Sequence, residues 1–279
     1  MKLIILGSGG AWSCPIPTCF CEKCREARDK GVPYSRGGPS LFIEEESILF
    51  DTPEEITQQL NREKVKRLRH VFYTHWHPDH TQGMRIFENI ARRLKHPQEL
   101  PFDAEMIDVY IPVEVYDDFK KYLSNFFYYE ENGWIRVHKI EDRKEIKIGR
   151  LSIIPLSFRV PGKSRYGYLI KESKKKVFYG PCSIWSMTTD ESFDSTDLML
   201  IEFGWLGNTE EKRKNDPKTS SIHYHISFEE DIELIRKLKP KRTILTHIDY
   251  TDFENAERLV KPFKKLNIDI AYDGMKIEV

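Results

Sequence analysis

The sequence predicts an α/β fold that forms a single domain of 279 residues. Short runs rich in β-branched and aromatic residues alternate with segments whose apolar residues recur at helical spacing. Hydrophobic residues make up 39% of the chain and charged residues 32%, a composition typical of a globular protein with a sizeable core. No apolar run approaches the ~20 residues of a bilayer-spanning helix, and the run at 2–6 is too short for a signal peptide. We therefore expect a cytoplasmic protein with no membrane partner.

The first half of the chain is expected to alternate strands with helices. Thr52 and Pro53 are expected to begin the second helix, because a threonine can cap backbone N–H groups and proline fits the first helical position. The expected strands are 2–6, two strands within 40–50 that turn at 44–46, 71–74 and 109–112. The expected helices are 22–30, 52–64, 83–94 and 113–127.

The second half begins with strand-like alternation from 134 to 170, in which Gly149 and Arg150 form a hairpin turn. Ser227 and Glu230 have the spacing of a capping box, which predicts a helix that ends before Pro240. The remaining expected elements are strands at 177–180, 198–203 and 243–246, a polar loop at 204–221, a helix at 254–266 and a closing pair of strands. No internal repeat or linker divides the chain into two domains.

The most informative stretch follows the apolar strand at 71–74. Residues 75–80, His-Trp-His-Pro-Asp-His, hold three imidazoles and a carboxylate, and Pro78 prevents the strand from continuing. We expect a loop that turns alternate side chains toward one point. Three imidazoles and a carboxylate at one point suit a divalent ion such as zinc, whereas stacked histidines without a cation would gain nothing.

Four of the five cysteines form a second candidate metal site between residues 14 and 24. Cys19, Cys21 and Cys24 have the spacing C-x-C-x-x-C, and Cys14 lies five residues earlier. Four thiolates close together can hold a structural zinc, and this use suits a reducing compartment better than disulfides. The alternative is that some of these cysteines are small buried residues.

The glycine-rich turn at residues 7–10 does not predict a dinucleotide site. A dinucleotide fingerprint needs a helix directly after the turn, and Trp12, Pro15 and Pro17 prevent one. We expect the glycines to let the backbone pass close to the metal edge instead.

The pattern H-x-H-x-D-H at 75–80 resembles the motif of the metallo-β-lactamase superfamily. The resemblance implies a four-layer αβ/βα sandwich with a one- or two-metal site at one edge. Three further stretches are similar to the subfamily of the phosphonate-pathway cyclic phosphodiesterase and the pyrroloquinoline-quinone biosynthesis protein B. They are the cysteine knuckle after Gly7-Ser-Gly-Gly10, the run from His225 to Glu230, and Ile244-Leu-Thr-His247. The similarity extends over nearly the whole chain.

Several roles are implied by this resemblance. His75 and His77 belong to a first metal position, and Asp79, His80 and His247 belong to a second. Asp51 would orient a metal-binding histidine from behind, although an ordinary turn aspartate is the alternative. His225 would hold the substrate phosphate or protonate the leaving group, so Asp79 and His225 are the candidate catalytic residues.

The chain departs from the family pattern at three places. A third histidine is expected near 158–160, but no histidine lies between His138 and His223. Cys182 stands where a bridging aspartate is expected, unless the alignment slips by one to Pro181. Tyr250 stands about where a histidine completes the knuckle, so Cys14 is expected to be the fourth ligand there. We therefore predict a structural zinc, one firmly held edge ion (Zn, Mn or Fe), and a weak or empty neighbouring position.

The predicted function is a metal-dependent hydrolase, a phosphodiesterase that uses a metal-bound hydroxide on a small cyclic phosphate ester or nucleotide. Arg159 or Arg165 could hold a phosphate oxygen, or could be a solvated charge. The 44 basic and 44 acidic residues balance, so long nucleic acid is not expected as a partner. The oligomeric state is open, with a homodimer as one alternative.

Two other functions remain open. The incomplete first position and the cysteine at 182 would also fit a degenerate or non-hydrolytic member with a biosynthetic, redox or ligand-binding role. A tRNA-processing nuclease shares the histidine motif, but the four-cysteine knuckle and the absence of an obvious basic arm count against it.

Overall fold

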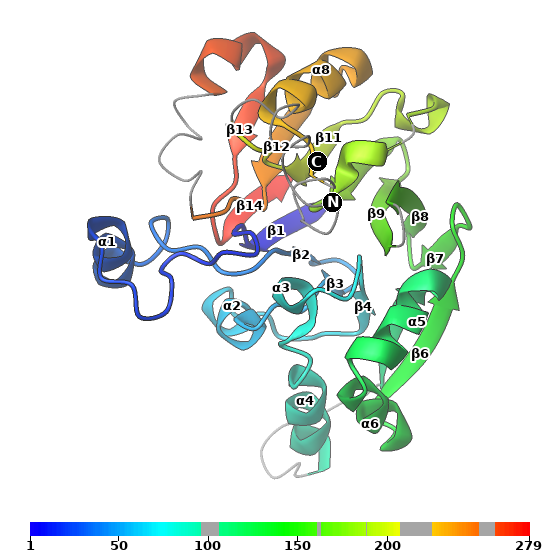
Figure 1. Cartoon of the computed structure of the whole chain (residues 1–279). Helices are drawn as coiled ribbons and strands as arrows, with labels where there is room; N and C mark the ends of the chain where they lie inside the picture. Colours follow the sequence, from blue (N-terminus) through cyan, green and yellow to red (C-terminus); the bar gives the residue numbers. More distant parts are fainter. Residues whose placement is uncertain (96–105, 161–162, 188, 207–224, 251–259) are drawn as a thin grey trace.

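The structure is a computed structural model that describes residues 1–95, 106–160, 163–187, 189–206, 225–250 and 260–279. Over these residues, two mixed sheets of seven strands each pack face to face. The helices between residues 56 and 131 cover the outer face of the first sheet, and the helix at 228–238 covers that of the second (Figure 1). The predicted α/β fold, with its αβ/βα sandwich, is confirmed.

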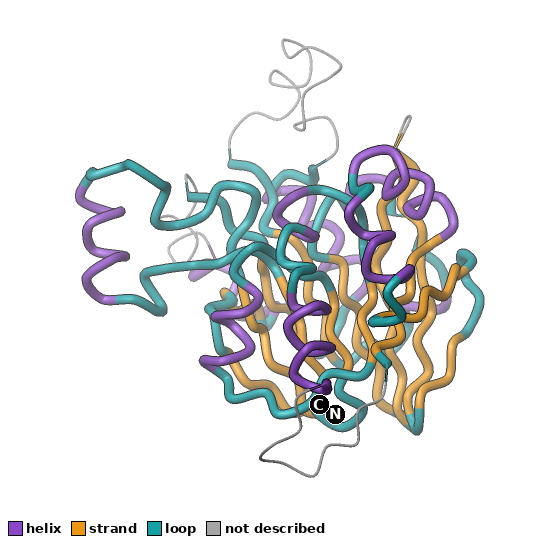
Figure 2. Tube along the Cα trace, turned by 90° about the horizontal axis from the view of Figure 1, so that it is seen from below, coloured by secondary structure: helices purple, strands orange, loops and turns teal. Residues whose placement is uncertain are grey.

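The first sheet carries the histidine motif. Its strand order is β14-β1-β2-β3-β4-β5-β6, antiparallel from β14 to β3 and parallel from β3 to β6. Its strands are β1 (Lys2–Gly7), β2 (Ser40–Ile43), β3 (Ile48–Phe50), β4 (His70–Phe72), β5 (Ile107–Pro112), β6 (Ile135–Ile140) and β14 (Met275–Glu278). The two chain ends lie side by side, where the Met1 amino group donates to the Val279 carbonyl at 3.1 Å (Figure 2).

The second sheet has the order β13-β12-β11-β10-β9-β8-β7. Strands β10 to β13 run parallel, and β7 to β10 form an antiparallel meander. Its strands are β7 (Ile146–Ile148), β8 (Leu151–Val160), β9 (Lys163–Glu172), β10 (Lys175–Gly180), β11 (Leu198–Glu202), β12 (Arg242–Thr246) and β13 (Ile268–Ile270).

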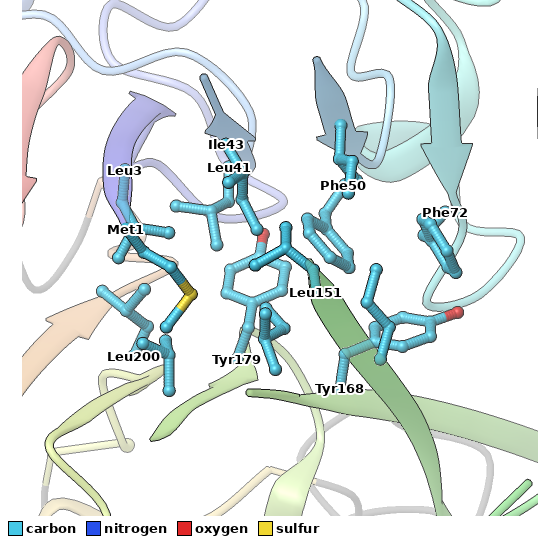
Figure 3. Packing of buried hydrophobic residues seen from close by; sticks show 14 of the residues in the cluster. Met1, Leu3, Leu41, Ile43, Phe50, Phe72, Leu151, Tyr168, Tyr179 and Leu200 are labelled. Atoms are coloured by element: carbon cyan, nitrogen blue, oxygen red, sulfur yellow. The ribbon is translucent and has the colours of Figure 1, made fainter. Parts of the chain in front are cut away.

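The central core lies between the two sheets. Alternate side chains of each strand point into it, as the two-residue period of a strand requires. Phe50 lies near its centre, with its ring centroid 5.3 Å from Phe72, 5.2 Å from Tyr168 and 5.5 Å from Tyr179 (Figure 3). The opposite side chains of each sheet pack against the helices, which gives two further apolar layers.

Most of the predicted helices form, but some of their ends differ, the helix predicted at 113–127 is divided in two, and residues 78–81 form a short helix. The capping box is confirmed, since Ser227 Oγ accepts from the Glu230 N–H at 3.1 Å and Glu230 Oε2 accepts from the Ser227 N–H at 2.7 Å. The helices are α1 (Glu22–Lys30), α2 (Ile56–Arg62), α3 (Pro78–Thr81), α4 (Ile86–Lys95), α5 (Val113–Tyr122), α6 (Asn125–Glu131) and α8 (Phe228–Leu238). Short 3-10 turns are η1 (Ile184–Ser186), η2 (Glu191–Phe193) and η4 (Lys261–Leu266). Residues 254–259 of the predicted last helix lie outside the described residues.

Two predicted helix ends are wrong. The second helix begins at Ile56 and not at Thr52, because Thr52 is buried and its hydroxyl lies 2.8 Å from the Tyr73 hydroxyl. The helix predicted at 113–127 is divided after Tyr122, since Leu123 leaves the helical conformation with φ −129°. Leu123 turns its side chain into the same buried layer as Phe126.

Parallel strands place the polar residues of both sheets at one edge. β3 and β4 run parallel, so Asp51 and His75, which follow them, leave the first sheet at the same side. β10, β11 and β12 are parallel as well, and they deliver Cys182, Glu202 and His247 in the same way. None of the helices in the described part of the chain is long and apolar enough to cross a membrane.

Candidate metal centre

The histidine motif closes into a short helix instead of the predicted loop. Pro78 occupies the first turn of α3, where its missing N–H costs nothing, and Thr81 anchors the turn by donating to the His77 carbonyl at 2.9 Å. His75 is fully buried before this turn, and His80 is fully buried within it. The helical turn therefore points His80 and Asp79 into the molecule toward the second sheet.

Asp79, His80 and His247 form the first group of candidate ligands. Their ligand atoms all lie within 4.8 Å of one another. Asp79 Oδ2 is 3.3 Å from the Nε2 atoms of both His80 and His247, which are 3.4 Å apart. Two strand ends that are distant in the sequence thus deliver imidazoles to one carboxylate, as the second metal position requires.

A second group consists of His75, His80 and Cys182, again with ligand atoms within 4.8 Å of one another. Cys182 Sγ lies 3.9 Å from His75 Nε2. Because His80 belongs to both groups, a single ion could choose its ligands from five side chains. The sequence assigned His75 to a separate first position, whereas its Nε2 atom lies with the residues of the second.

His77 stands apart from both groups. Its Nε2 atom lies 2.8 Å from Nη2 of Arg165, which is 2% exposed and belongs to β9. A guanidinium only donates, so the His77 nitrogen accepts this hydrogen bond. The alternative that Arg165 is a solvated charge is therefore wrong, and the side chain of Arg159 lies outside the described residues.

Asp51 lies directly behind the ligand groups. Its Oδ2 atom accepts from His80 Nδ1 at 2.8 Å and from Thr74 Oγ1 at 2.8 Å, and Oδ1 accepts from the Thr74 N–H at 2.8 Å. These bonds hold a proton on His80 Nδ1, so Nε2, which faces Asp79 and His247, is the nitrogen that would bind an ion after losing its own proton. The expected orienting role fits this geometry better than that of an ordinary turn residue.

Three residues of this edge have left-handed backbones. Asp51 has φ 61°, Ser183 has φ 57° and His247 has φ 55°. Such angles cost a residue with a side chain on the order of 1–3 kcal/mol and often mark functional sites. Gly10 also allows a close approach, because a Cβ there would lie 2.8 Å from His247 Nδ1. The predicted role of the glycine-rich turn is confirmed for this residue.

The electrostatics of the site favour charged ligand atoms. Burial would raise the pKa of the Cys182 thiol, but the charges of His247 and His225 lower it to about 6. Burial also opposes ionisation of Asp79, yet the charge of His80 and the hydrogen bond from His247 hold the pKa of its carboxyl well below the usual range. Burial, followed by the charge of Arg165, holds the pKa of His75 well below its usual value, so its imidazole is neutral.

His225 has a partner that the sequence analysis missed. Its Nδ1 atom lies 2.5 Å from Oε2 of Glu202, and the other Glu202 oxygen accepts from the Ile184 N–H at 2.7 Å. Burial would lower the pKa of His225, but the Glu202 carboxylate raises it above the usual value. The only indication in the sequence is a charged residue that ends the apolar strand 198–202.

The cysteine knuckle forms only in part as predicted. Cys19, Cys21 and Cys24 have their sulfur atoms within 4.8 Å of one another. Of the described cysteines, Cys14 remains outside this group, since its Sγ atom donates to the Tyr34 carbonyl at 3.6 Å. The Tyr250 hydroxyl lies 2.9 Å from Cys21 Sγ, and this hydrogen bond lowers the pKa of the Cys21 thiol to about 6.

Both clusters pass a test of donor chemistry. The edge offers imidazole nitrogens, a carboxylate and a thiolate, and three or four such donors suit a tetrahedral divalent ion. The knuckle offers three thiolates, the softest donors in proteins. Both are therefore candidate metal sites.

Two packed mixed sheets with histidine, aspartate and cysteine ligands at their shared edge define a protein of the metallo-β-lactamase fold. The chain belongs to the β-lactamase superfamily, because residues 46–248 match the model of the β-lactamase superfamily domain. The family predicted from the sequence is thus confirmed.

Solved structures show the same fold over the whole chain. A diphosphatase of the PhnP family is 22% identical with a TM-score of 0.70, and the alignment covers 100% of this chain and 96% of that one. Zinc-bound PqqB from Methylobacterium extorquens is 16% identical with a TM-score of 0.75, covering 100% of both chains. The protein YhfI from Bacillus subtilis is 15% identical with a TM-score of 0.70, covering 100% and 99%. No curated protein sequence matches this chain.

Proposed function

We propose that this protein is a metal-dependent hydrolase that cleaves a small phosphate ester, such as a cyclic phosphodiester or a nucleotide. The observation that carries the proposal is the convergence of Asp79, His80 and His247 from two different sheets. The fold shared with a diphosphatase supports phosphate chemistry. The balance of 44 basic and 44 acidic residues favours a small substrate over long nucleic acid.

The edge residues would hold one divalent ion, for which zinc is the best match. Cys182 supplies a thiolate, and Asp79 with the imidazoles of His75, His80 and His247 completes a donor set that zinc prefers over magnesium or calcium. A divalent ion in such a site lowers the pKa of water toward ~7 and polarises phosphoryl oxygens. Asp51, by accepting from Nδ1 of His80, would leave Nε2 of that ring to bind the ion.

His225 is the proposed general acid. Glu202 binds its Nδ1 atom and favours the protonated imidazolium, so the proton on Nε2 can pass to the departing oxygen of the ester. The His225 ring lies 6.0 Å from the His247 ring, which puts this proton beside the ligand groups. Without the acid, the leaving group would depart as an alkoxide.

Turnover of bis-para-nitrophenyl phosphate with added zinc or manganese tests the hydrolase proposal. We expect metal-dependent turnover that Asp79→Ala abolishes and that chelation suppresses. His225→Gln should lower kcat toward para-nitrophenyl esters less than toward esters of poor alcohols, because a good leaving group needs no acid. Equal losses on both esters would contradict the acid role. Absence of turnover with every divalent ion, in folded protein, would refute the hydrolase.

The specific feature that favours the alternative, non-hydrolytic function is Cys182. A buried thiol with a pKa of about 6, 3.9 Å from His75 Nε2, is also suited to binding or redox chemistry. The fold shared with PqqB over the full length of both chains is compatible with this alternative. Cys182→Asp distinguishes the two, because an aspartate ligand should retain or increase ester turnover in a hydrolase and should abolish a thiol-dependent activity.

A further inference from the structure

The buried arginine of β9 contacts His77, one of the two histidines that the family resemblance assigns to the first metal position. Arg165 is 2% exposed, and its Nη1 atom donates to the Ser164 carbonyl at 3.2 Å while Nη2 donates to His77 at 2.8 Å. Both terminal nitrogens of the guanidinium therefore have a hydrogen-bond partner that fixes the position of the side chain. The charge is permanent, because an arginine side chain does not lose its proton in proteins.

An ion and this guanidinium cannot both bind His77, because a neutral imidazole whose Nε2 accepts from Arg165 carries its proton on Nδ1 and has no second lone pair to offer. An imidazole nitrogen has one lone pair, and a zinc ion would lie about 2.0–2.1 Å from it along the same direction. Nη2 already lies on that side, 2.8 Å from His77 Nε2. A cation there would overlap the guanidinium and meet a charge of the same sign.

The other histidine of that position is also committed elsewhere. His75 Nε2 belongs to the group with His80 and Cys182, and its Nδ1 atom lies 3.0 Å from Thr74 Oγ1. The residues that a first ion would need are thus divided between an arginine and the second position. The first metal position does not fit an ion in this chain.

We propose that Arg165 replaces the first metal ion, so that one divalent ion and one fixed guanidinium together bind an oxyanion of the substrate. His77 connects the guanidinium to the ligand groups, because the rings of His75 and His77 lie 4.7 Å apart and those of His75 and His80 lie 4.1 Å apart. Guanidinium matches the geometry of phosphate with two parallel N–H groups. The choice of a phosphate rests on the proposed function, whereas the exclusion of a second ion does not.

Metal counting tests the exclusion. Protein is loaded with excess zinc, desalted and analysed by elemental mass spectrometry. The His247→Ala variant lacks an edge ligand, so the zinc that it retains gives the contribution of the knuckle, which is subtracted from the total. We expect one edge ion in the parent. Arg165→His, which releases His77 and adds an imidazole, should hold two, and Arg165→Lys should hold one. Two edge ions in the parent would overturn the proposal whether or not the variants fold.

Calorimetric titration of the zinc-loaded protein with inorganic phosphate tests the anion site. Arg165→Gln should weaken phosphate binding by about 10- to 100-fold, the loss expected for a charge-assisted pair. Arg143→Gln is the matched control, because Arg143 pairs with Asp190 on the surface, and it should leave phosphate affinity and ion count unchanged. Equal phosphate affinity in Arg165→Gln and the parent would refute the anion site. A protein with one edge ion and arginine-dependent phosphate binding, but no ester turnover, would refute the proposed hydrolase function. The replacement of the first ion by Arg165 would still hold in that case.

Discussion

The substitution Asp51→Asn tests the most detailed feature of the candidate centre, the orientation of His80. Asp51 accepts three hydrogen bonds, two from Thr74 and one from His80 Nδ1, each 2.8 Å long. Asparagine keeps one oxygen and replaces the other with an NH₂ group. If the oxygen stays on the Thr74 N–H, the new amide presents a donor to His80 Nδ1, which is itself a donor in the parent.

The His80 ring would relieve this conflict by moving its proton to Nε2. That atom lies 3.3 Å from Asp79 Oδ2 and 3.4 Å from His247 Nε2, where an ion would bind. We therefore expect the affinity of the edge site for zinc to fall about 10- to 100-fold, equal to about 1.4–2.8 kcal/mol. Competition with a fluorescent chelator measures this affinity, after the knuckle ion has been counted separately.

Asp273→Asn is the matched control. Asp273 is also a buried carboxylate that accepts three hydrogen bonds, from the Ser8 N–H at 2.9 Å, the Ser8 hydroxyl at 2.8 Å and the Gly37 N–H at 2.9 Å. Its loss should lower the melting temperature without changing the zinc affinity. A folded Asp51→Asn protein whose zinc affinity lies within twofold of the parent would show that Asp51 does not set the His80 tautomer.

Three further predictions concern the knuckle, the core and pH. Tyr250→Phe should lower the zinc affinity of the knuckle more than Cys14→Ser does, because Tyr250 contacts Cys21 while Cys14 contacts Tyr34. If a zinc-release assay gave the reverse order, Cys14 would be the fourth ligand, as the sequence predicts. Phe50→Ala should cost about 3–5 kcal/mol in denaturant unfolding, and a loss below about 1 kcal/mol would contradict its central packing. Burial, then the charge of Glu202, raises the pKa of Asp231 well above its usual range, so the parent should lose stability as pH rises above about 4 toward that raised pKa. Asp231→Asn should abolish this loss of stability. If the difference in melting temperature between the variant and the parent did not grow from acidic to alkaline pH, the prediction would be wrong.

Local patterns in the sequence were sufficient for most of the elements. The capping box of Ser227 and Glu230 depends on residues three apart, and the structure forms it at the predicted place. Thr52 shows where such patterns fail. It has the chemistry of a helix cap, but its hydroxyl is used by Tyr73, a residue from another strand. Tertiary hydrogen bonds outweighed a local preference of about 1 kcal/mol.

In the candidate site, too, some contacts could be predicted from the sequence and others could not. The motif at 75–80 predicted that His80 and Asp79 would meet His247, because strand ends of a known fold share one edge. No spacing in the sequence could show that His77 faces Arg165 or that Glu202 holds His225. Those pairs join residues 88 and 23 positions apart, and each depends on how a side chain leaves its strand.

The fold and the kinds of ligand could be inferred from the sequence, since strand periodicity and the clustering of imidazole, carboxylate and thiolate groups are properties of short segments. The nitrogen that each histidine offers and the cation that it faces depend instead on contacts between segments far apart in the chain. A nitrogen such as His77 Nε2 can bind one hydrogen-bond donor or one metal ion. Because β9 places Arg165 beside His77, this nitrogen accepts a hydrogen bond from the arginine.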